Sequence, residues 1–274
     1  MRKGISIDLN VHFMKRIISI IGLTAIILLS SFHTLEKRLF EVKKVVIDAG
    51  HGGHDPGTMG VLSSEKDIAL KIALKLGKYI EERVQGVEVI FTRDNDTFVG
   101  LKGRAYIANK NGADIFISIH CNAFKPNPEV FGTETYVMGI DKAGRNLEVA
   151  KQENSVIYLE ENYEESYQGF DPNSPESLIL LSLEQTAYQE NSLRLAANIE
   201  NQFKNRGGRR SRGVKMAPFW VLWDTSMPSV LVETGYLSNR KEERDLNDNY
   251  KQDLIASAIF RAFRDYKEEI DSRN

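Results

Sequence analysis

The chain has 274 residues, which suits one or two globular domains and is long enough to bury a sizeable core. Its 36 Lys and Arg residues against 38 Asp and Glu residues leave a formal net charge of -2, so it lacks the basic excess expected of a protein that binds nucleic acid. The single cysteine, Cys121, excludes an internal disulfide framework and cysteine-rich zinc clusters, so histidines and carboxylates must hold any metal.

The first 43 residues are typical of an export signal. An uncharged apolar block over residues 17–32 follows Lys15 and Arg16. The block is shorter than the roughly 20 residues that span a bilayer, and no A-x-A cleavage site follows it. The pattern predicts a signal peptide or an N-terminal signal anchor over residues 1–43. We therefore expect an exported protein, in the periplasm or on the outer face of the cytoplasmic membrane.

Strands and helices alternate from residue 44 onward. Hydrophobic periodicity predicts the order strand, helix, strand, helix, strand, over residues 44–48, 64–83, 87–92, 101–110 and 114–120. Ser64 followed by Asp67 is a variant of the capping box and predicts the start of the first helix. The order predicts an α/β fold, a single domain whose mostly parallel twisted sheet has helices on both faces.

The second half of the chain continues the alternation around two charged stretches. Strands are predicted over residues 133–138, 219–223 and 229–233, and helices over residues 183–204 and 249–270. An acidic run in between contains Glu160, Glu161, Glu164 and Glu165, and a basic run covers residues 204–215. Solvated surface is the simplest interpretation of both runs. Alternatively, the acidic run could fold over a metal site, and the basic run could hold an anionic polymer or a lipid surface.

Four side chains are candidates for a catalytic site: His51, Glu65, His120 and Glu233. His51 follows the first strand, His120 and Glu233 each end a strand, and Glu65 begins a helix. Ligands of open α/β sheets bind at the carboxyl ends of the strands, so these side chains should converge on one rim. Two imidazoles and one carboxylate are a standard ligand set for catalytic zinc, with a fourth position open. Glu233 lies in an apolar strand, which would raise its pKa and suit it to act as a general base.

Each of these residues, taken alone, also has a simpler interpretation. His51 could be an ordinary loop residue, His120 a hydrogen-bonded strand end, and Glu65 a favourable charge at a helix N-terminus. His54 is a spare ligand candidate in the same glycine-rich turn and ranks below His51. The turn matches neither the dinucleotide-binding nor the Walker pattern. Cys121 should point away from His120, because successive strand residues face opposite sides of a sheet.

Five segments occur in one order along the chain: IDAGHGGHDPG around His51, SSEKDIAL around Glu65, RDNDTFVGLKGRAYIAN over residues 93–109, SIHCNA around His120 and PSVLVETGYLSN around Glu233. Together they resemble the zinc-dependent N-acetylmuramoyl-L-alanine amidases, sometimes called amidase family 3. The resemblance covers about residues 44–270. It implies cleavage of the amide between N-acetylmuramic acid and L-alanine in peptidoglycan, with one zinc ion held by His51, Glu65 and His120, and with Glu233 as the catalytic glutamate.

The resemblance also implies a domain organisation and a form of regulation. Residues 44–274 would be the catalytic domain, with a candidate regulatory insertion over residues 155–182. Some family members carry an inserted helix that blocks the zinc until an activator protein removes it. We therefore expect an acidic side chain of residues 155–182 to approach the zinc in the resting state.

The expected biological role is cell-wall remodelling and daughter-cell separation. We expect a monomer that contacts the membrane only through its N-terminal segment. Two alternative functions stay open at this point. One is a zinc peptidase that cuts within the stem peptide, and the other is a non-catalytic wall-binding regulator.

Overall fold

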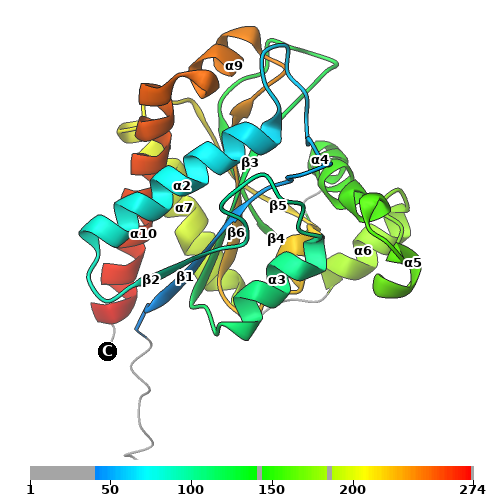
Figure 1. Cartoon of the computed structure of the whole chain (residues 1–274), viewed down its shortest axis with the longest axis horizontal. Coiled ribbons are helices and arrows are strands. Elements are labelled where there is room, and N and C mark those ends of the chain that lie inside the picture. The colour runs from blue at the N-terminus through cyan, green and yellow to red at the C-terminus, as the bar shows by residue number, and fades with distance from the viewer. Residues whose placement is uncertain (1–40, 141–143, 184–186, 273–274) are drawn as a thin grey trace, which may run out of the picture. The chain divides into compact units, whose positions relative to one another are not determined.

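A computed structural model describes residues 41–140, 144–183 and 187–272, which form one α/β unit (Figure 1). The sheet of this described part has six strands, in the order β2-β1-β3-β6-β4-β5. The strands are β1 (Lys44–Ala49), β2 (Glu88–Phe91), β3 (Ile115–Asn122), β4 (Thr133–Met138), β5 (Ser211–Ala217) and β6 (Ser229–Tyr236). Neighbouring strands are parallel except for β4 and β6. The predicted fold class is confirmed.

Helices cover both faces of the sheet (Figure 1). One face is covered by α2 (Glu65–Arg83), α7 (Gln189–Asn205) and α10 (Asn249–Ser272). The other is covered by α3 (Leu101–Lys110), α4 (Gly144–Asn154) and the short α8 (Trp220–Trp223). The remaining elements are a 3-10 turn, η1 (Ser155–Leu159), α5 (Tyr163–Ser166), α6 (Pro175–Leu183) and α9 (Arg240–Asn247).

The two cores follow from the alternation of side chains along the buried strands. In β3, Ile117, Ile119 and Cys121 belong to the core under α2 and α10, whereas Phe116 belongs to the opposite core. Cys121 therefore faces away from His120, as predicted. None of the helices in the described residues is long and apolar enough to cross a bilayer. The apolar block over residues 17–32 lies outside the described residues, so the export signal stays a prediction.

Two predicted elements differ from the structure, and one strand was not predicted. Residues 219–223 were expected to form a strand, but the amides of Leu222 and Trp223 donate to the carbonyl of Phe219, and the segment closes into the short helix α8. The helix predicted over residues 183–204 begins only at Gln189. The strand β5 was not predicted, because its half-exposed and basic sequence lacks an apolar alternation.

The start of α2 is confirmed, although by a different contact. Ser64 has an extended backbone and precedes the first helical residue, Glu65. Its hydroxyl donates to Asp67 Oδ2 (2.5 Å) rather than capping a backbone amide of the described chain. The contact orients Ser64 and leaves Glu65 as the first residue of the helix, with its side chain facing the rim of the sheet.

Candidate metal centre

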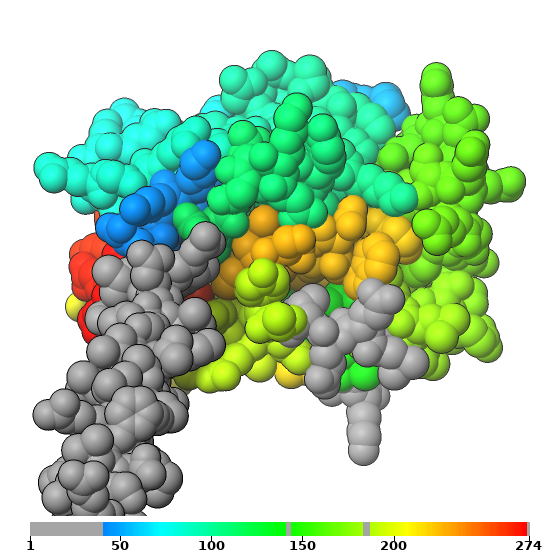
Figure 2. Space-filling view, turned by 90° about the horizontal axis from the view of Figure 1, so that it is seen from below, coloured from blue at the N-terminus to red at the C-terminus, as the bar shows by residue number. Residues whose placement is uncertain are grey.

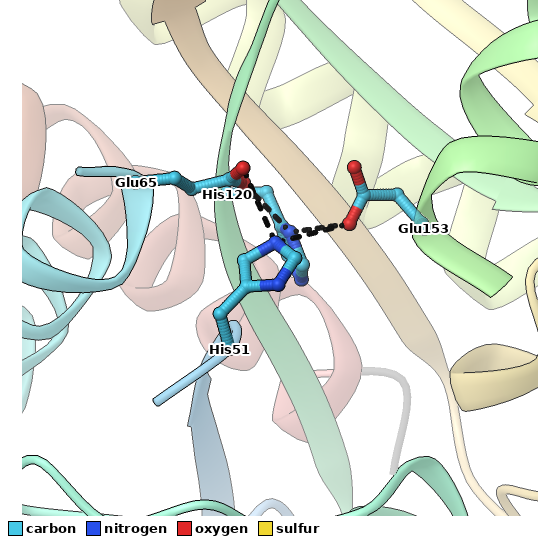
Figure 3. A group of neighbouring side chains, drawn as sticks. All are labelled: His51, Glu65, His120 and Glu153. Carbon is cyan, nitrogen blue, oxygen red and sulfur yellow. Dashed lines mark hydrogen bonds and ion pairs between the residues drawn. The ribbon is translucent and has the colours of Figure 1, made fainter. Parts of the chain in front are cut away.

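Three of the predicted site residues converge with a fourth that was not predicted (Figure 3). His51 follows β1, Glu65 is the first residue of α2, His120 lies in β3, and Glu153 lies in α4. All four side chains are buried, and one ligand atom from each lies within 4.8 Å of the others. Figure 3 shows Glu65 and Glu153 approaching the two imidazoles from opposite sides.

The contacts inside this cluster are short. His51 Nε2 lies 3.2 Å from Glu65 Oε2 and 3.2 Å from Glu153 Oε2. His120 Nδ1 lies 3.0 Å from Glu65 Oε1 and 3.0 Å from Glu153 Oε2. The Glu153 carboxylate therefore completes a ring of two nitrogens and two carboxylates around one point.

The loop after β1 holds His51 in an unusual conformation. His51 has a φ of 60°, which costs an L-residue about 1–2 kcal/mol. Asp55 Oδ2 lies 2.7 Å from His51 Nδ1, and Arg104 donates to the His51 carbonyl (2.8 Å). A Cβ at Gly50 would lie 2.4 Å from the His120 ring, so only glycine leaves room for this packing. The loop therefore sets the tautomer of His51 and leaves its Nε2 facing the cluster.

Backbone amides orient Glu65. Thr58 N donates to Glu65 Oε2 (2.8 Å), and Cys121 N donates to Glu65 Oε1 (2.9 Å). Burial would raise the pKa of Glu65, but the charges of His51 and His120 and their hydrogen bonds outweigh burial and lower it. Glu65 is thus an anion at neutral pH, as a metal ligand must be.

The two histidines carry protons when no metal is present. Burial disfavours the charged imidazolium, but the carboxylates of Glu153 and Glu65 outweigh it and raise the pKa of His120 to about 9. The pKa of His51 is raised well above its ordinary value in the same way, with burial opposed mainly by the Glu65 charge. Two buried carboxylates therefore require positive charge between them, from protons or from a metal ion.

The geometry fits a metal ion. A tetrahedral site with bonds of about 2.0–2.1 Å has ligand atoms about 3.3 Å apart, close to the 3.0–3.2 Å between the histidine nitrogens and the carboxylate oxygens of the cluster. In addition, His51 Nε2 and Glu153 Oε2 are buried without a hydrogen-bond partner among the described residues. Buried polar atoms are rarely left in this state unless something is missing between them. The cluster could therefore hold one divalent metal ion.

Glu233 lies next to the cluster, near the end of β6. It pairs in register with His120 of the parallel strand β3, so both side chains leave the same face of the sheet. The side chain is fully buried, and neither carboxylate oxygen has a hydrogen-bond partner in the described part of the chain. Burial, followed by the charges of Glu153 and Glu65, raises the pKa of Glu233 well above its ordinary value. Such a carboxyl group has a strong tendency to take up a proton.

Glu153 was missed because it lies two residues before the segment in which an acidic side chain was expected. Within residues 155–182, the carboxylate of Glu160 instead accepts hydrogen bonds from Leu101 N (2.9 Å) and the Tyr167 hydroxyl (2.6 Å). The sequence did carry a signal for Glu153. It shares the buried face of α4 with Val149 and Ala150, at spacings of three and four residues, where a carboxylate needs a partner.

Two other candidates lie outside the cluster. His54 is exposed, and its ring packs on Phe98 at 4.1 Å between centroids. Burial raises the pKa of the Cys121 thiol well above its ordinary value, and its sulfur contacts the Thr234 hydroxyl (3.2 Å) on the far side of β3. The thiol is therefore protonated and poorly placed to act as a nucleophile.

Comparisons with known proteins agree on one family. A family profile described as N-acetylmuramoyl-L-alanine amidase matches residues 45–265. The N-acetylmuramoyl-L-alanine amidase AmiA of Escherichia coli is 36% identical over 219 residues, which are 78% of this chain and 73% of that protein.

Two solved structures share the fold. The N-acetylmuramoyl-L-alanine amidase from Clostridium difficile 630 aligns with a TM-score of 0.62 and 27% identity, over 83% of this chain and 98% of that one. The CwlD amidase from Clostridioides difficile, solved in complex with the GerS lipoprotein, aligns with a TM-score of 0.61 and 28% identity, over 83% of this chain and 99% of that one.

Proposed function

The chain belongs to the N-acetylmuramoyl-L-alanine amidase family and is an amidase of peptidoglycan, and we propose that its reaction uses one zinc ion held by His51, Glu65 and His120. The observation that carries this proposal is the buried cluster itself, in which His51 Nε2 lies 3.2 Å from two carboxylate oxygens but makes no hydrogen bond among the described residues. Two histidines and a carboxylate are a common protein ligand set of catalytic zinc.

The protein residues then have distinct roles in the hydrolysis. A zinc ion at this position would supply Lewis acidity to the scissile carbonyl and to the attacking water. Glu233 accepts a proton from the attacking water while the oxygen of that water bonds to the lactyl carbonyl carbon. Glu233 then passes the proton to the alanine nitrogen as the C–N bond breaks. The products are a lactyl carboxylic acid and a stem peptide with a free amine, and transfer of the acid proton to the amine gives a carboxylate and an ammonium.

Replacement of Glu233 tests this assignment. Glu233→Gln keeps the size of the side chain but removes the base, so we expect turnover of a purified muropeptide to fall by about 10²- to 10⁴-fold. Zinc content and the unfolding temperature should stay those of the wild type, as measured by elemental analysis and calorimetry. Near-normal turnover would refute the role of Glu233.

Product analysis distinguishes the amidase from a zinc peptidase that cuts within the stem peptide. On purified sacculi, the amidase leaves a peptide-free glycan and intact stem peptides with an N-terminal alanine. A peptidase leaves shortened peptides on the glycan, and a non-catalytic binder leaves the sacculi intact. Mass spectrometry of the soluble and insoluble fractions separates the three outcomes.

The structure also supports a proposal of autoinhibition. Glu153 offers a fourth ligand to the cluster, whereas catalytic zinc keeps its fourth position open for a water or substrate, and Gln152 of the same helix donates to the Thr58 hydroxyl (2.6 Å). We propose that α4 blocks the metal centre and that it must move before a substrate can bind. Residues 155–183, which follow α4, form a lobe beside α8 (Figure 2), where Tyr167 packs on Trp220 at 4.9 Å between centroids. This lobe exposes Ile179 and Leu180 and would give an activator protein access to α4.

Replacement of Glu153 tests autoinhibition. Glu153→Ala removes the blocking ligand and should raise basal amidase activity on sacculi by about tenfold or more, because a larger fraction of molecules is then competent to bind substrate. Glu148→Ala is the matched control, since Glu148 lies on the same helix with its side chain 71% exposed. Equal activities of the two variants would contradict the proposal.

The cellular setting is proposed from the N-terminal pattern and from the substrate. Peptidoglycan lies outside the cytoplasmic membrane, so we propose that residues 1–43 direct export and that the enzyme acts in cell-wall remodelling and daughter-cell separation. A fusion of residues 1–43 to a reporter that is active only outside the cytoplasm should be active. Loss of the enzyme should produce chains of unseparated cells, and normal separation would contradict the proposed role.

A further inference from the structure

A second ionic cluster lies beside Glu233 and plays no part in the mechanism above. Glu134 of β4 is directly opposite Glu233 in the antiparallel β4–β6 ladder, and its side chain is 2% exposed. Its Oε2 accepts a hydrogen bond from the Tyr136 hydroxyl (2.8 Å), and its Oε1 lies 2.8 Å from Arg212 Nε and 3.3 Å from an Arg145 nitrogen. The two carboxylates therefore leave adjacent strands on the same face of the sheet, and both are buried.

The Arg145 guanidinium lies between two aromatic rings and beside a carboxylate, an environment that favours a cation. Its Cζ lies 5.0 Å from the centroid of the Phe124 ring and 5.5 Å from that of Tyr236, distances at which an aromatic face attracts a cation. Its terminal nitrogen also donates to the Tyr236 hydroxyl. We call the group formed by Phe124, Glu134 and Tyr236 the cation box.

Arg145 reaches the box from the blocking helix. It lies in the first turn of α4, and Glu153 lies in the last turn of the same helix. A movement of α4 that takes Glu153 from the metal centre therefore also withdraws Arg145. Glu134 and the Tyr236 ring keep Arg212, whose Cζ lies 5.8 Å from the centroid of that ring, but the Phe124 ring and the Tyr236 hydroxyl lose their cation.

We propose that the cation box is a substrate subsite for a primary ammonium group, and that Arg145 occupies it in the resting enzyme. This inference rests on the proposed function, because it needs peptidoglycan to bind where α4 now lies. An ammonium is smaller than a guanidinium and can donate to Glu134 Oε1 and to the Tyr236 hydroxyl between the same two rings. The blocking helix thus imitates two groups at once, since Glu153 takes a ligand position and Arg145 takes the position of a substrate cation.

A stem peptide offers this chemistry from two sources. One is the side-chain amine of its diamino acid, which is present before cleavage. The other is the alanine amine, which becomes an ammonium only after the scissile bond breaks. The first source would strengthen substrate binding, and the second would make the released peptide an inhibitor.

The experiment uses the full chain with zinc and the Glu153→Ala replacement, so that the substrate can reach the surface that α4 covers. We compare kcat/KM for a muropeptide with a free diamino-acid side chain and for the same muropeptide acetylated on that amine. In parallel, we compare inhibition by the product peptide with a free and with an acetylated N-terminus. We expect one of the two acetylations to weaken binding by about tenfold. The acetylation that has this effect shows whether the side-chain amine or the alanine amine binds in the cation box.

Replacements in the box then assign the effect. The preference for the free amine is the ratio between the free and the acetylated compound in kcat/KM or in the inhibition constant. Glu134→Gln and Phe124→Leu should each bring this ratio close to one, through KM or the inhibition constant rather than kcat. Both replacements also loosen Arg145, but this changes the rates on both substrates alike and cancels in their ratio. Glu129→Gln, an exposed acidic position in the loop after Phe124, is the matched control and should keep the preference.

The proposal is overturned if neither acetylation affects cleavage or inhibition. It is also overturned if Glu134→Gln and Phe124→Leu, with wild-type unfolding temperatures, keep the full preference. Failure of the proposed function gives a different result, because the Glu153→Ala enzyme would then cleave neither muropeptide at the lactyl–alanine bond.

Discussion

At the scale of single residues, Asp48 shows how a buried charge supports the rim of the sheet. It is fully buried in β1, and its carboxylate contacts Arg104 (2.7 Å) and the hydroxyls of Ser118 (2.5 Å) and Thr92 (2.6 Å). Arg104 in turn donates to the carbonyls of Ala49 and His51, so the ion pair connects the core to the loop that carries His51.

Replacement of Asp48 should be strongly destabilising. Asp48→Asn leaves the Arg104 charge buried without its anion, which typically costs about 3–5 kcal/mol of unfolding free energy. Urea denaturation at pH 7 measures the loss. Asp114→Asn is a useful comparison at a more exposed strand end, and an equal loss in both variants would contradict a special role for the buried pair.

The same pair predicts a pH dependence of stability. Burial would raise the pKa of Asp48, but Arg104 and the two hydroxyls outweigh burial and hold it below its ordinary value. The pair therefore contributes stability above the unfolded-state pKa of about 3.9, and this contribution is lost as the pH falls through the lower folded-state pKa. The stability difference between wild type and Asp48→Asn should shrink below about pH 4, and a constant difference would contradict this account.

The sequence predicted His51, Glu65 and His120 as neighbours because parallel strands bring their carboxyl ends to one rim. It did not predict Glu153, since α4 belongs to a part of the chain without a regular strand and helix alternation. Position relative to a strand end is visible in a sequence, whereas the docking of one helix over a site depends on long-range contacts. The structure brings Glu153 to the cluster, but the catalytic role of Glu233 stays a prediction.

At the scale of elements, α4 is held at both ends by polar contacts. Arg145 joins its first turn to the cation box, and Asn154 joins its end to Pro218 O (2.8 Å) and Trp220 N (2.8 Å). These polar contacts hold both ends of α4, while Val149 and Ala150 pack its middle against the core.

Replacement of Arg145 should therefore release α4 more often. Arg145→Ala removes an ion pair and two cation–π contacts, and we expect basal activity to rise by about tenfold. Hydrogen exchange of the α4 amides should be faster to a similar extent, whereas exchange in β3 should not change. Unchanged exchange in α4 would show that Arg145 does not hold the helix.

Elements with a clear period were predicted well, and elements determined by their surroundings were not. The helix α2 and the strands β1 and β3 carry regular apolar patterns and match the prediction closely. The strand β5 is an edge strand with basic side chains. Basic side chains protect an edge from aggregation, but they also remove the apolar alternation by which a strand is predicted. The residues of α8 are aromatic and aliphatic, as in a strand, and only tertiary packing makes them form a helical turn.

At the scale of the whole molecule, the metal centre joins elements from both halves of the chain. His51, Glu65 and His120 come from the first half, and Glu153 comes from the second. A ligand that binds only the folded state stabilises it, by about 2.7 kcal/mol when its free concentration is 100 times the dissociation constant.

Metal removal should thus lower the unfolding temperature. For a domain of this size the loss corresponds to about 5–10 °C, measurable by calorimetry with zinc and with a chelator. His51→Ala and His120→Ala should bind less metal and show little difference between the two conditions. A wild-type unfolding temperature that is the same with zinc and with chelator would contradict the assigned metal centre.

The place of β6 in the sheet has a consequence for the folding of the chain. Among the described strands β6 is the last in sequence, yet it lies between β3 and β4. Before it is added, β2, β1 and β3 can form one ribbon and β4 and β5 another, each with an unpaired inner edge open to aggregation. Assembly of the two ribbons must wait until nearly the whole chain has emerged from the ribosome or the translocation pore. The same final step places Glu233 beside the candidate metal centre, so the proposed catalytic base arrives only when the sheet is complete.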